Sequence, residues 1–539
     1  MQNKTNIIIW YLLLMLFTFN TFAAKTQMLQ GGQVPNGLSK QEWINIQKQL
    51  KTNQYKASSG LQQQAYIKAS NAEAVDQFGW SVAISGDTLV VGARDESSNT
   101  TGVNGNQDNN LASYSGAVYV FGRTAGKWKQ EAYLKASNTK TYDQFGWSVA
   151  ISGNTIAVGA YNEGSNTTGI NGDETNNLAG KSGAVYIFTR TTFGLWSQQA
   201  YLKASNTGIL DQFGYTVSLS GDTLAVGANW EDSRGNGINS DEDDDSLIHS
   251  GAVYVFTRNA GTWQQQAYLK ASNSDAGDEF GNAVAIADDI LVVGARFEQS
   301  HATGVDGIEF DNSAEFAGAA YVFIRSGDTW EQQAYLKASN TEAYDHFGHS
   351  VSISNDTLAI GAIWESSNAT EVNGDESDNS AGYAGAVYVF TRSDNKWQQQ
   401  AYIKATNTNT HDRFGGSVSI SDNILLIGAY GEDSKALGIG GNQNNNSASF
   451  AGAAYVFSRR EGDWKQETYL KASNTESHDQ FGWSVSISEE TIVVAAHAED
   501  SNAVGIGGDE SNNFAEAAGA VYVFGSTVDL ISISSFEDI

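Results

Sequence analysis

The chain has 539 residues, of which 40% are hydrophobic and 17% charged, a composition that argues against wholesale disorder. Acidic residues outnumber basic ones 61 to 31, giving a formal net charge of −30. This charge argues against general binding to nucleic acids or anionic membranes, because contact with phosphates needs a basic surface. Cysteine is absent, which excludes disulfides, zinc–thiolate sites and thiol catalysis.

The first 24 residues have the pattern of a signal peptide. After Lys4, an apolar run extends from Ile7 to Phe19, and Ala23 and Ala24 offer small residues for cleavage. The run is shorter than the about 20 residues needed to span a bilayer. The pattern predicts export to the extracellular space, the cell surface or the periplasm, without a transmembrane segment.

Residues 25–60 form a separate N-terminal segment. Ser39 and Glu42 have the spacing of a capping box, and Trp43, Ile46 and Leu50 follow as an apolar stripe. This pattern predicts a short helix. We expect it to pack on the following domain, and a partner-binding helix is the alternative.

The rest of the chain is dominated by a repeat with steps of 67 or 68 residues. A Phe-Gly pair recurs in seven copies, beginning at Phe78, Phe145, Phe213, Phe280, Phe347, Phe414 and Phe481. A second marker, Gly-Ala-(Val/Ala)-Tyr-(Val/Ile)-Phe, recurs with the same steps, beginning at Gly116, Gly183, Gly251, Gly318, Gly385, Gly452 and Gly519. Seven copies in register predict a repeat architecture.

Each repeat is predicted to contain four strands, which we call A to D. In the first repeat they cover residues 80–85, 88–93, 117–121 and 128–136. Strand C has apolar residues on both of its faces, so it belongs in a sheet that is covered on both sides. Seven such four-stranded units predict an all-β fold, a seven-bladed β-propeller. A linear solenoid is the alternative, but it needs capping repeats and none is visible.

The two ends of the repeat region complement each other. The last repeat stops at Phe524 without its strand D, and a matching strand stands at residues 62–70. The N-terminal strand is therefore expected to complete the seventh blade in a 3+1 arrangement, which removes two open sheet edges. The predicted propeller covers residues 61–524, and a tail of residues 525–539 follows.

These repeats resemble FG-GAP repeats, the units of the seven-bladed propeller in integrin α subunits. The chain resembles bacterial secreted FG-GAP proteins more closely still, because it contains runs such as Ser-Gly-Asp-Thr-Leu-Val-Val-Gly-Ala at residues 85–93. The resemblance covers about residues 62–524 and is specific for the propeller fold, whereas it says much less about function. Integrin repeats carry a calcium loop between strands A and B. Here a tight turn such as residues 152–155 replaces that loop, so the calcium site does not transfer to this position.

The loops between strands B and C are long in every repeat, and they share one face with the D–A connections. Binding residues concentrate on loops held by a rigid scaffold, so this face is the predicted functional face. An Asp two residues before each repeated Phe is expected to accept backbone N–H groups in the D–A turn. A Glu at the start of each B–C loop is expected either to accept its own loop's N–H groups or to ligate a cation: Glu96, Glu163, Glu231, Glu298, Glu365, Glu432 and Glu499.

Oxygen-rich B–C loops predict calcium as the ion that stabilises the propeller, and no organic cofactor is expected. Asn-Gly-Asp corners contain Asp173 and Asp375, and the third repeat carries five adjacent acidic residues at 241–245. Hard cations such as Ca²⁺ prefer such oxygen ligands. A solvated acidic loop is the alternative. The candidate metal ligands are Glu231, Asp241, Asp243, Asp245, Asp173 and Asp375.

Positions that differ between repeats are the candidates for ligand binding. Trp230, Phe297 and Trp364 occupy one position in three consecutive repeats, and Tyr215 and His349 follow their Phe-Gly pairs. Aromatic side chains of this kind suit a protein or glycan partner, whereas burial under the loops is the alternative. No set of catalytic residues is recognisable. The predicted function is non-catalytic adhesion or interaction by a monomeric propeller. The alternative is a secreted hydrolase or lyase with carboxylates near the central channel.

Overall fold

A computed structural model describes residues 60–526 of the chain, and residues 62–525 form one compact unit. In the described residues, seven four-stranded sheets follow one another, each with neighbouring strands hydrogen-bonded. The first four blades, from inner to outer strand, contain β2 (Phe78–Ser85), β3 (Thr88–Ala93), β4 (Ala117–Thr124), β5 (Lys127–Leu134); β6 (Ser148–Ser152), β7 (Thr155–Ala160), β8 (Ala184–Arg190), β9 (Trp196–Leu202); β10 (Thr216–Ser220), β11 (Thr223–Ala228), β12 (Ala252–Asn259), β13 (Thr262–Leu269); and β14 (Ala283–Ala287), β15 (Ile290–Ala295), β16 (Ala319–Ser326), β17 (Thr329–Leu336).

The last three blades repeat the same order, and the final blade takes its outer strand from the N-terminal end of the described chain. These blades contain β18 (Phe347–Ser354), β19 (Thr357–Ala362), β20 (Ala386–Ser393), β21 (Lys396–Ile403); β22 (Phe414–Ser421), β23 (Ile424–Ala429), β24 (Ala453–Arg460), β25 (Asp463–Leu470); and β26 (Val485–Ser488), β27 (Thr491–Ala496), β28 (Ala520–Ser526), β1 (Leu61–Ile67). The predicted seven-bladed, all-β propeller is confirmed.

The predicted strands of the first repeat agree with β2 to β5, with shifted ends. Strand C continues to Thr124 in a hairpin with β5, and strand D ends at Leu134 instead of residue 136. The early end has a local cause: the N–H of Lys135 donates to the carbonyl of Gly102 in the long loop, at 2.8 Å, and no longer to a strand. Strand C is buried on both faces as predicted, because Val118, Tyr119, Val120 and Phe121 are all fully buried.

The hydrophobic core lies between neighbouring blades. One cluster joins Phe78, Leu89 and Tyr119 of the first blade to Val493 and Val521 of the last. Each sheet therefore buries both faces against other sheets, which explains why the side chains on both faces of its central strands are apolar.

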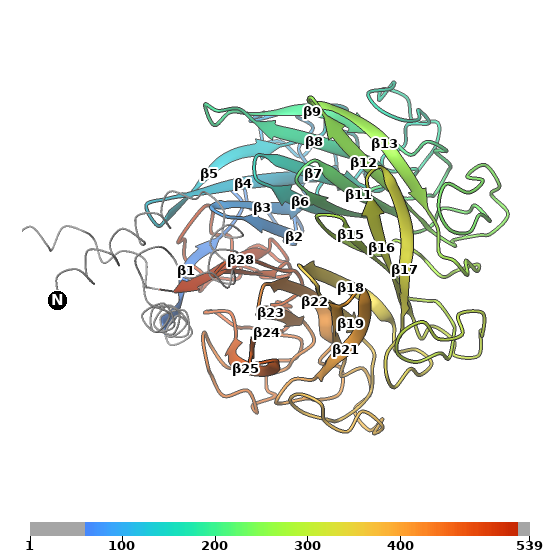
Figure 1. Cartoon of the computed structure of the whole chain (residues 1–539). Helices are drawn as coiled ribbons and strands as arrows, with labels where there is room; N and C mark the ends of the chain where they lie inside the picture. Colours follow the sequence, from blue (N-terminus) through green and yellow to red (C-terminus); the bar gives the residue numbers. More distant parts are fainter. Residues whose placement is uncertain (1–59, 527–539) are drawn as a thin grey trace, which may run out of the picture. The chain divides into compact units, whose positions relative to one another are not determined.

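The ring closes between the first and last blades as predicted. In Figure 1, the blue strand β1 lies beside the red strand β28, with which it shares a sheet. The inner strands also meet, since the N–H groups of Val82 and Ile84 donate to the hydroxyls of Ser484 and Ser486, both at 3.2 Å. The 3+1 seventh blade is thus formed by residues from both ends of the repeat region.

The repeated glycines mark the seam between blades. Gly116 has a φ of +81°, and a Cβ there would lie 2.0 Å from the carbonyl oxygen of Phe145 in the next blade. Gly146, in the same Phe-Gly pair as Phe145, has a φ of +90°. Only glycine combines this backbone conformation with so close an approach, which explains both repeated markers.

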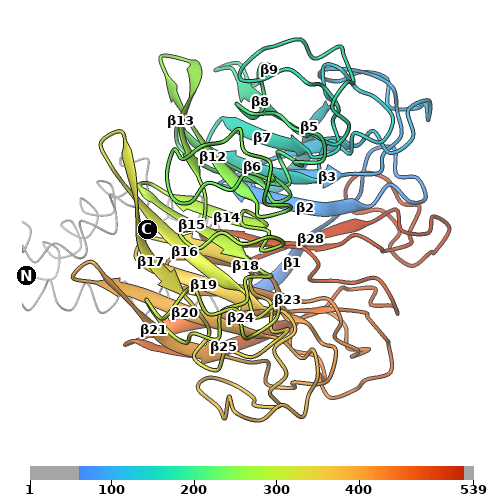
Figure 2. The same ribbon diagram turned by 90° about the vertical axis from the view of Figure 1, so that its right-hand side faces the viewer.

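Long and short connections emerge on opposite faces of the propeller. In Figure 2, the C–D hairpins of the green, yellow and orange blades extend to the left, and the long B–C loops of the blue and red blades extend to the right. The predicted signal peptide (1–24) and the Trp43 helix lie outside the described residues, as does the tail beyond Ser526. Within the described part, no helix is long and apolar enough to cross a membrane.

Candidate functional site

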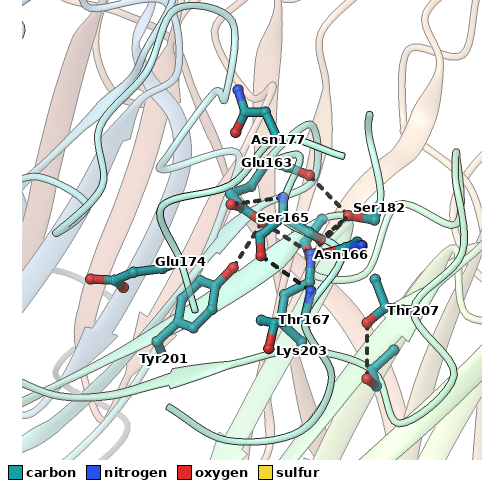
Figure 3. Close-up of polar contacts among 12 residues, drawn as sticks. Glu163, Ser165, Asn166, Thr167, Glu174, Asn177, Ser182, Tyr201, Lys203 and Thr207 are labelled. Carbon is teal, nitrogen blue, oxygen red and sulfur yellow. Dashed lines mark hydrogen bonds and ion pairs between the residues drawn. The ribbon is translucent and has the colours of Figure 1, made fainter. Parts of the chain in front are cut away.

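A buried ion pair lies beneath every long loop. In the second blade, Nζ of Lys203 lies 3.0 Å from Oε2 of Glu163, and both side chains are almost fully buried (Figure 3). The hydroxyl of Tyr201 donates to the same carboxylate, and Lys203 also donates to the hydroxyl of Ser182. The ion pair recurs in all seven blades, in the pairs Glu96–Lys135, Glu163–Lys203, Glu231–Lys270, Glu298–Lys337, Glu365–Lys404, Glu432–Lys471 and Glu499–Lys68.

The structure thus assigns a partner to the repeated Glu that the sequence patterns left open. The cation that this Glu binds is the ammonium group of a lysine at the end of strand D. In three blades the Glu also accepts an N–H of its own loop, as predicted, from Ser165, Ser367 and Ser434. Glu231, a candidate metal ligand, accepts hydrogen bonds from Asn206 and Tyr268 and pairs with Lys270 at 2.9 Å.

Residues that follow the equivalent lysine of the preceding blade, such as Lys135 for the second blade, also hold the loop. Asn138 donates from Nδ2 to Glu163 at 3.0 Å and to the carbonyl of Glu174 at 2.8 Å. Ser137 donates to the Glu174 carboxylate at 2.7 Å. Because a Lys-Ala-Ser-Asn or closely similar run recurs at the end of every strand D, each long loop is fixed to its own blade by the lysine and to the preceding blade by the Ser and Asn.

The repeated Asp of the D–A turn has the predicted role. In the second blade the N–H of Lys140 donates to Oδ2 of Asp143 at 3.1 Å, and the other six blades repeat the bond. These carboxyls are buried. Burial, and then the charge of Glu163, raise the pKa of Asp143 to about 7. The same causes, with Glu298 as the neighbouring charge, raise the pKa of Asp278 to about 8.

The other candidate metal ligands lie on exposed loops. Asp173 accepts two hydrogen bonds from Thr175, and Asp375 accepts two from Ser377; these bonds lower the pKa of both carboxyls. Asp241, Asp243 and Asp245 are exposed, and the N–H of Asp243 donates to Asp241 at 3.1 Å. Within residues 60–526, no group of three or more His, Asp or Glu side chains has a geometry that could hold a metal ion. Calcium binding stays a prediction.

The three predicted aromatics form one connected line across blades three to five. Trp230 is half-buried, stacks on His249 and donates from Nε1 to Glu279 at 3.0 Å. Glu279 pairs with Arg296 at 2.6 Å, and that guanidinium lies 4.7 Å from the ring centre of Phe297.

The line continues through a buried histidine. His346 lies 5.0 Å from Phe297 and 3.9 Å from Trp364, measured between ring centres. Burial, and then the charge of Arg296, lower the pKa of His346 to about 3, so its imidazole is neutral. Phe297 and Trp364 are half-buried, so each packs partly under a loop and is partly exposed, and their role in binding a partner stays a prediction.

Tyr215 and His349 lie elsewhere, at the centre of the ring. They line a cavity of about 510 Å³ at the long-loop end of the channel, together with Trp80, Trp147 and Trp483. Burial and Arg296 lower the pKa of His349 to about 3. The residues that follow the Phe-Gly pairs therefore meet around the propeller axis. Arg296 connects them to the line of Trp230, Phe297 and Trp364, because it lines the cavity and also lies over the Phe297 ring.

A further set of aromatic residues was missed by the sequence patterns. At the seams between blades, one residue of a B–C loop pairs with one residue of the next D–A turn. Four of these seams carry ring pairs with centres 5.2 to 6.0 Å apart: Tyr114–Tyr142, Phe316–Tyr344, Tyr383–His411 and Phe450–His478. We call these the seam pairs.

The seam pairs are exposed and conformationally unusual. The exposed fractions are 61% for Tyr142, 45% for Tyr344 and 42% for Tyr383. All eight residues have a positive φ, between 53° and 75°. Bulky residues in this region cost about 1–3 kcal/mol each. Equivalent residues of other blades, such as Val75 and Leu210, share this backbone, so the aromatic side chains distinguish the four seams. The signal available in the sequence was the variable residue just before each repeated Asp, which is aromatic or His in four repeats.

Comparison with protein-family models identifies the repeats. The FG-GAP repeat model matches residues 61–121, 128–188, 196–256, 263–323, 330–390, 397–457 and 464–524. Each match begins with the outer strand of one blade and ends with the third strand of the next, which agrees with the ring closure described above. Comparison with curated proteins gives no match. Because the seven matches cover most of the chain, the protein belongs to the FG-GAP repeat family.

Proposed function

We propose that the protein is an exported, non-catalytic adhesion or interaction module that binds a protein or glycan partner with its long-loop face. The propeller fold supports a protein-interaction module in general. The observation that carries the proposal is the set of seam pairs, which place exposed aromatic rings in strained backbone on that face. Aromatic side chains are enriched among the anchors of binding interfaces.

The loops beneath the seam pairs favour tight recognition. Each long loop is anchored by a buried Glu–Lys pair within its own blade and by a Ser and an Asn from the end of strand D in the preceding blade. A surface that is already ordered loses less conformational entropy on binding. We infer that the exposed edges of Trp230, Phe297 and Trp364 belong to the same surface.

The carboxylates near the channel favour binding over catalysis. Asp95 and Glu279 stand at the long-loop end, and each is paired with an arginine, Arg94 at 3.3 Å and Arg296 at 2.6 Å. Both oxygens of each carboxylate already accept a hydrogen bond, from Arg94 and Gln144 in Asp95 and from Arg296 and Trp230 in Glu279. These pairs do not support the hydrolase or lyase alternative. We further propose that Ca²⁺ stabilises the acidic loops around Asp173, Asp375 and residues 241–245.

The test compares two exposed surfaces of the full chain. The protein is labelled and applied to a glycan array and to immobilised cell-surface proteins. Tyr344→Ser and Tyr383→Ser together should weaken retention roughly tenfold or more, as the loss of an anchor predicts. Phe193→Ser is the matched control, because Phe193 is 90% exposed in a C–D hairpin on the opposite face. Equal retention of both variants would remove the seam pairs from the proposed interface.

A further inference from the structure

The cavity at the long-loop end of the channel has two unlike walls. Trp483, Trp80, Trp147 and Tyr215 line it from four consecutive blades, counted through the closure of the ring. The same position carries smaller residues in the other three blades, namely Asn282, His349 and Gly416. The space of about 510 Å³ lies between the aromatic wall and these smaller residues, and it is within the size range of small-molecule sites.

Arginines gather at this end of the channel although the chain has an excess of acidic residues. Arg296 lines the cavity, and the Arg94 guanidinium lies 3.3 Å from the ring centre of Trp80. Arg413 donates to the Tyr430 hydroxyl at 3.2 Å. Within residues 60–526, Arg413 has no carboxylate at ion-pair distance. The repeat does not require this cation, because most other blades carry Gln at its position.

Buried polar atoms without a partner occur at the same end of the propeller, and one of them belongs to the cavity lining. Among the described residues, 16 buried side-chain nitrogen and oxygen atoms lack a hydrogen-bond partner. Eight of them belong to residues in or next to the inner two strands on the long-loop side, and of these residues His349 lines the cavity: Gln77, Asn162, Asn229, His346, His349, Arg413 and His497. Asn229 is 1% exposed and neither its amide oxygen nor its nitrogen is partnered. Such atoms are costly unless water or a ligand satisfies them.

We propose that this cavity binds a carboxylate-bearing sugar ring, a uronate. The tryptophan rings offer flat apolar surfaces for the C–H face of the sugar, and Arg296, which lines the cavity, offers donors for its carboxylate. Arg413 does not line the cavity itself but donates to the lining residue Tyr430, and it supplies a second positive charge. The neutral imidazole of His349 offers a partner for a hydroxyl group. An aromatic acid would leave the polar wall without partners, and a neutral sugar would leave Arg413 without an anion. This site goes beyond the proposed partner surface and does not rest on it.

The test titrates the full chain with galacturonate and follows tryptophan fluorescence and heat, since three tryptophans line the cavity. Saturable binding by galacturonate is expected, with glucose and benzoate each weaker by roughly tenfold or more. A galacturonate trimer shows whether the natural ligand is the end of a polysaccharide or a free sugar acid. Tighter binding of the trimer than of the monomer indicates a polysaccharide end, and equal binding indicates the free sugar acid.

Two variants locate the site. Arg413→Gln should weaken galacturonate binding roughly tenfold, whereas Arg258→Gln, which removes an arginine paired with Asp222, should leave it unchanged. His349→Trp gives the fifth blade the residue that Trp80 supplies in the first, so it should fill the cavity and abolish binding in a folded chain. Absence of saturable binding, equal binding of glucose, or wild-type affinity in folded His349→Trp would overturn the proposal. The Tyr344 and Tyr383 variants should bind galacturonate normally, which separates this result from failure of the partner surface.

Discussion

Nζ of Lys68 lies 2.6 Å from Oε2 of Glu499, although 431 residues separate them in the chain. Both side chains are almost completely buried, and Tyr66 and Asn474 donate to the other oxygen of the same carboxylate, each at 2.9 Å. The six equivalent pairs join residues 39 or 40 positions apart. Lys68–Glu499 is therefore the pair that connects the N-terminal strand to the last blade.

Removing this lysine should open the ring. Lys68→Met leaves the Glu499 charge buried without its partner, which costs about 3–5 kcal/mol of unfolding free energy. Chemical denaturation measures the loss. Adding Glu499→Leu should recover much of it, because a well-packed apolar pair can replace a buried ion pair. Deleting residues 25–70 should destabilise the fold more than either variant. A propeller of unchanged stability after this deletion would contradict closure by the N-terminal strand.

Stability should fall as the pH rises through neutrality. The pKa of Asp278 is raised from 3.8 to about 8, so the native state holds a proton between these values that the unfolded chain has lost. The stabilisation is complete below the unfolded pKa and is lost as the pH passes the native one. The melting temperature should thus be higher at about pH 5.5 than at about pH 8.5.

Asp278→Asn tests this assignment directly. Its amide oxygen can still accept the N–H of Asp275, which donates to Oδ2 of Asp278 at 3.0 Å. The variant should lose less stability between the two pH values than the wild type. Asp328→Asn, at an exposed residue, should follow the wild type. Identical pH profiles for all three proteins would show that Asp278 titrates normally.

Calcium should raise the melting temperature modestly. A ligand that binds only the native state stabilises it by mass action, and the acidic loops offer oxygen ligands. Melts of the full chain in EDTA and in about 1 mM Ca²⁺ provide the comparison, and Mg²⁺ should substitute poorly because it demands a stricter geometry. Asp241→Asn with Asp243→Asn should reduce the difference. Superimposable melts in EDTA and Ca²⁺ would remove calcium from the proposal.

Trp364→Ala should affect binding and stability together. Its ring stacks on His346 and meets Tyr383 edge-on, but it is only half-buried. We expect partner binding to weaken by about 2 kcal/mol. The loss of stability should stay below the about 3–5 kcal/mol typical of a fully buried aromatic. Early unfolding with normal binding would make Trp364 a packing residue alone.

The sequence by itself determined the repeat, the number of blades and the strand that closes the ring. Phe78 and its six equivalents recur every 67 or 68 residues. Each such repeat contains one four-stranded unit whose central strands are apolar on both faces. The role of Asp143 was also predictable. Its carboxylate accepts a hydrogen bond from the N–H of the residue three positions earlier, and such a bond depends only on the local backbone geometry.

Only the tertiary structure decided which side chains meet across repeats. Lys68 stands in a run that resembles six others, and nothing in that run indicates Glu499 as its partner. Tyr344 reaches Phe316 because two loops of neighbouring blades are brought together at a seam, and Trp483 reaches Trp80 because the ring closes. Local patterns define a blade, whereas the seam pairs, the cavity and the closing ion pair depend on how seven blades pack around one axis.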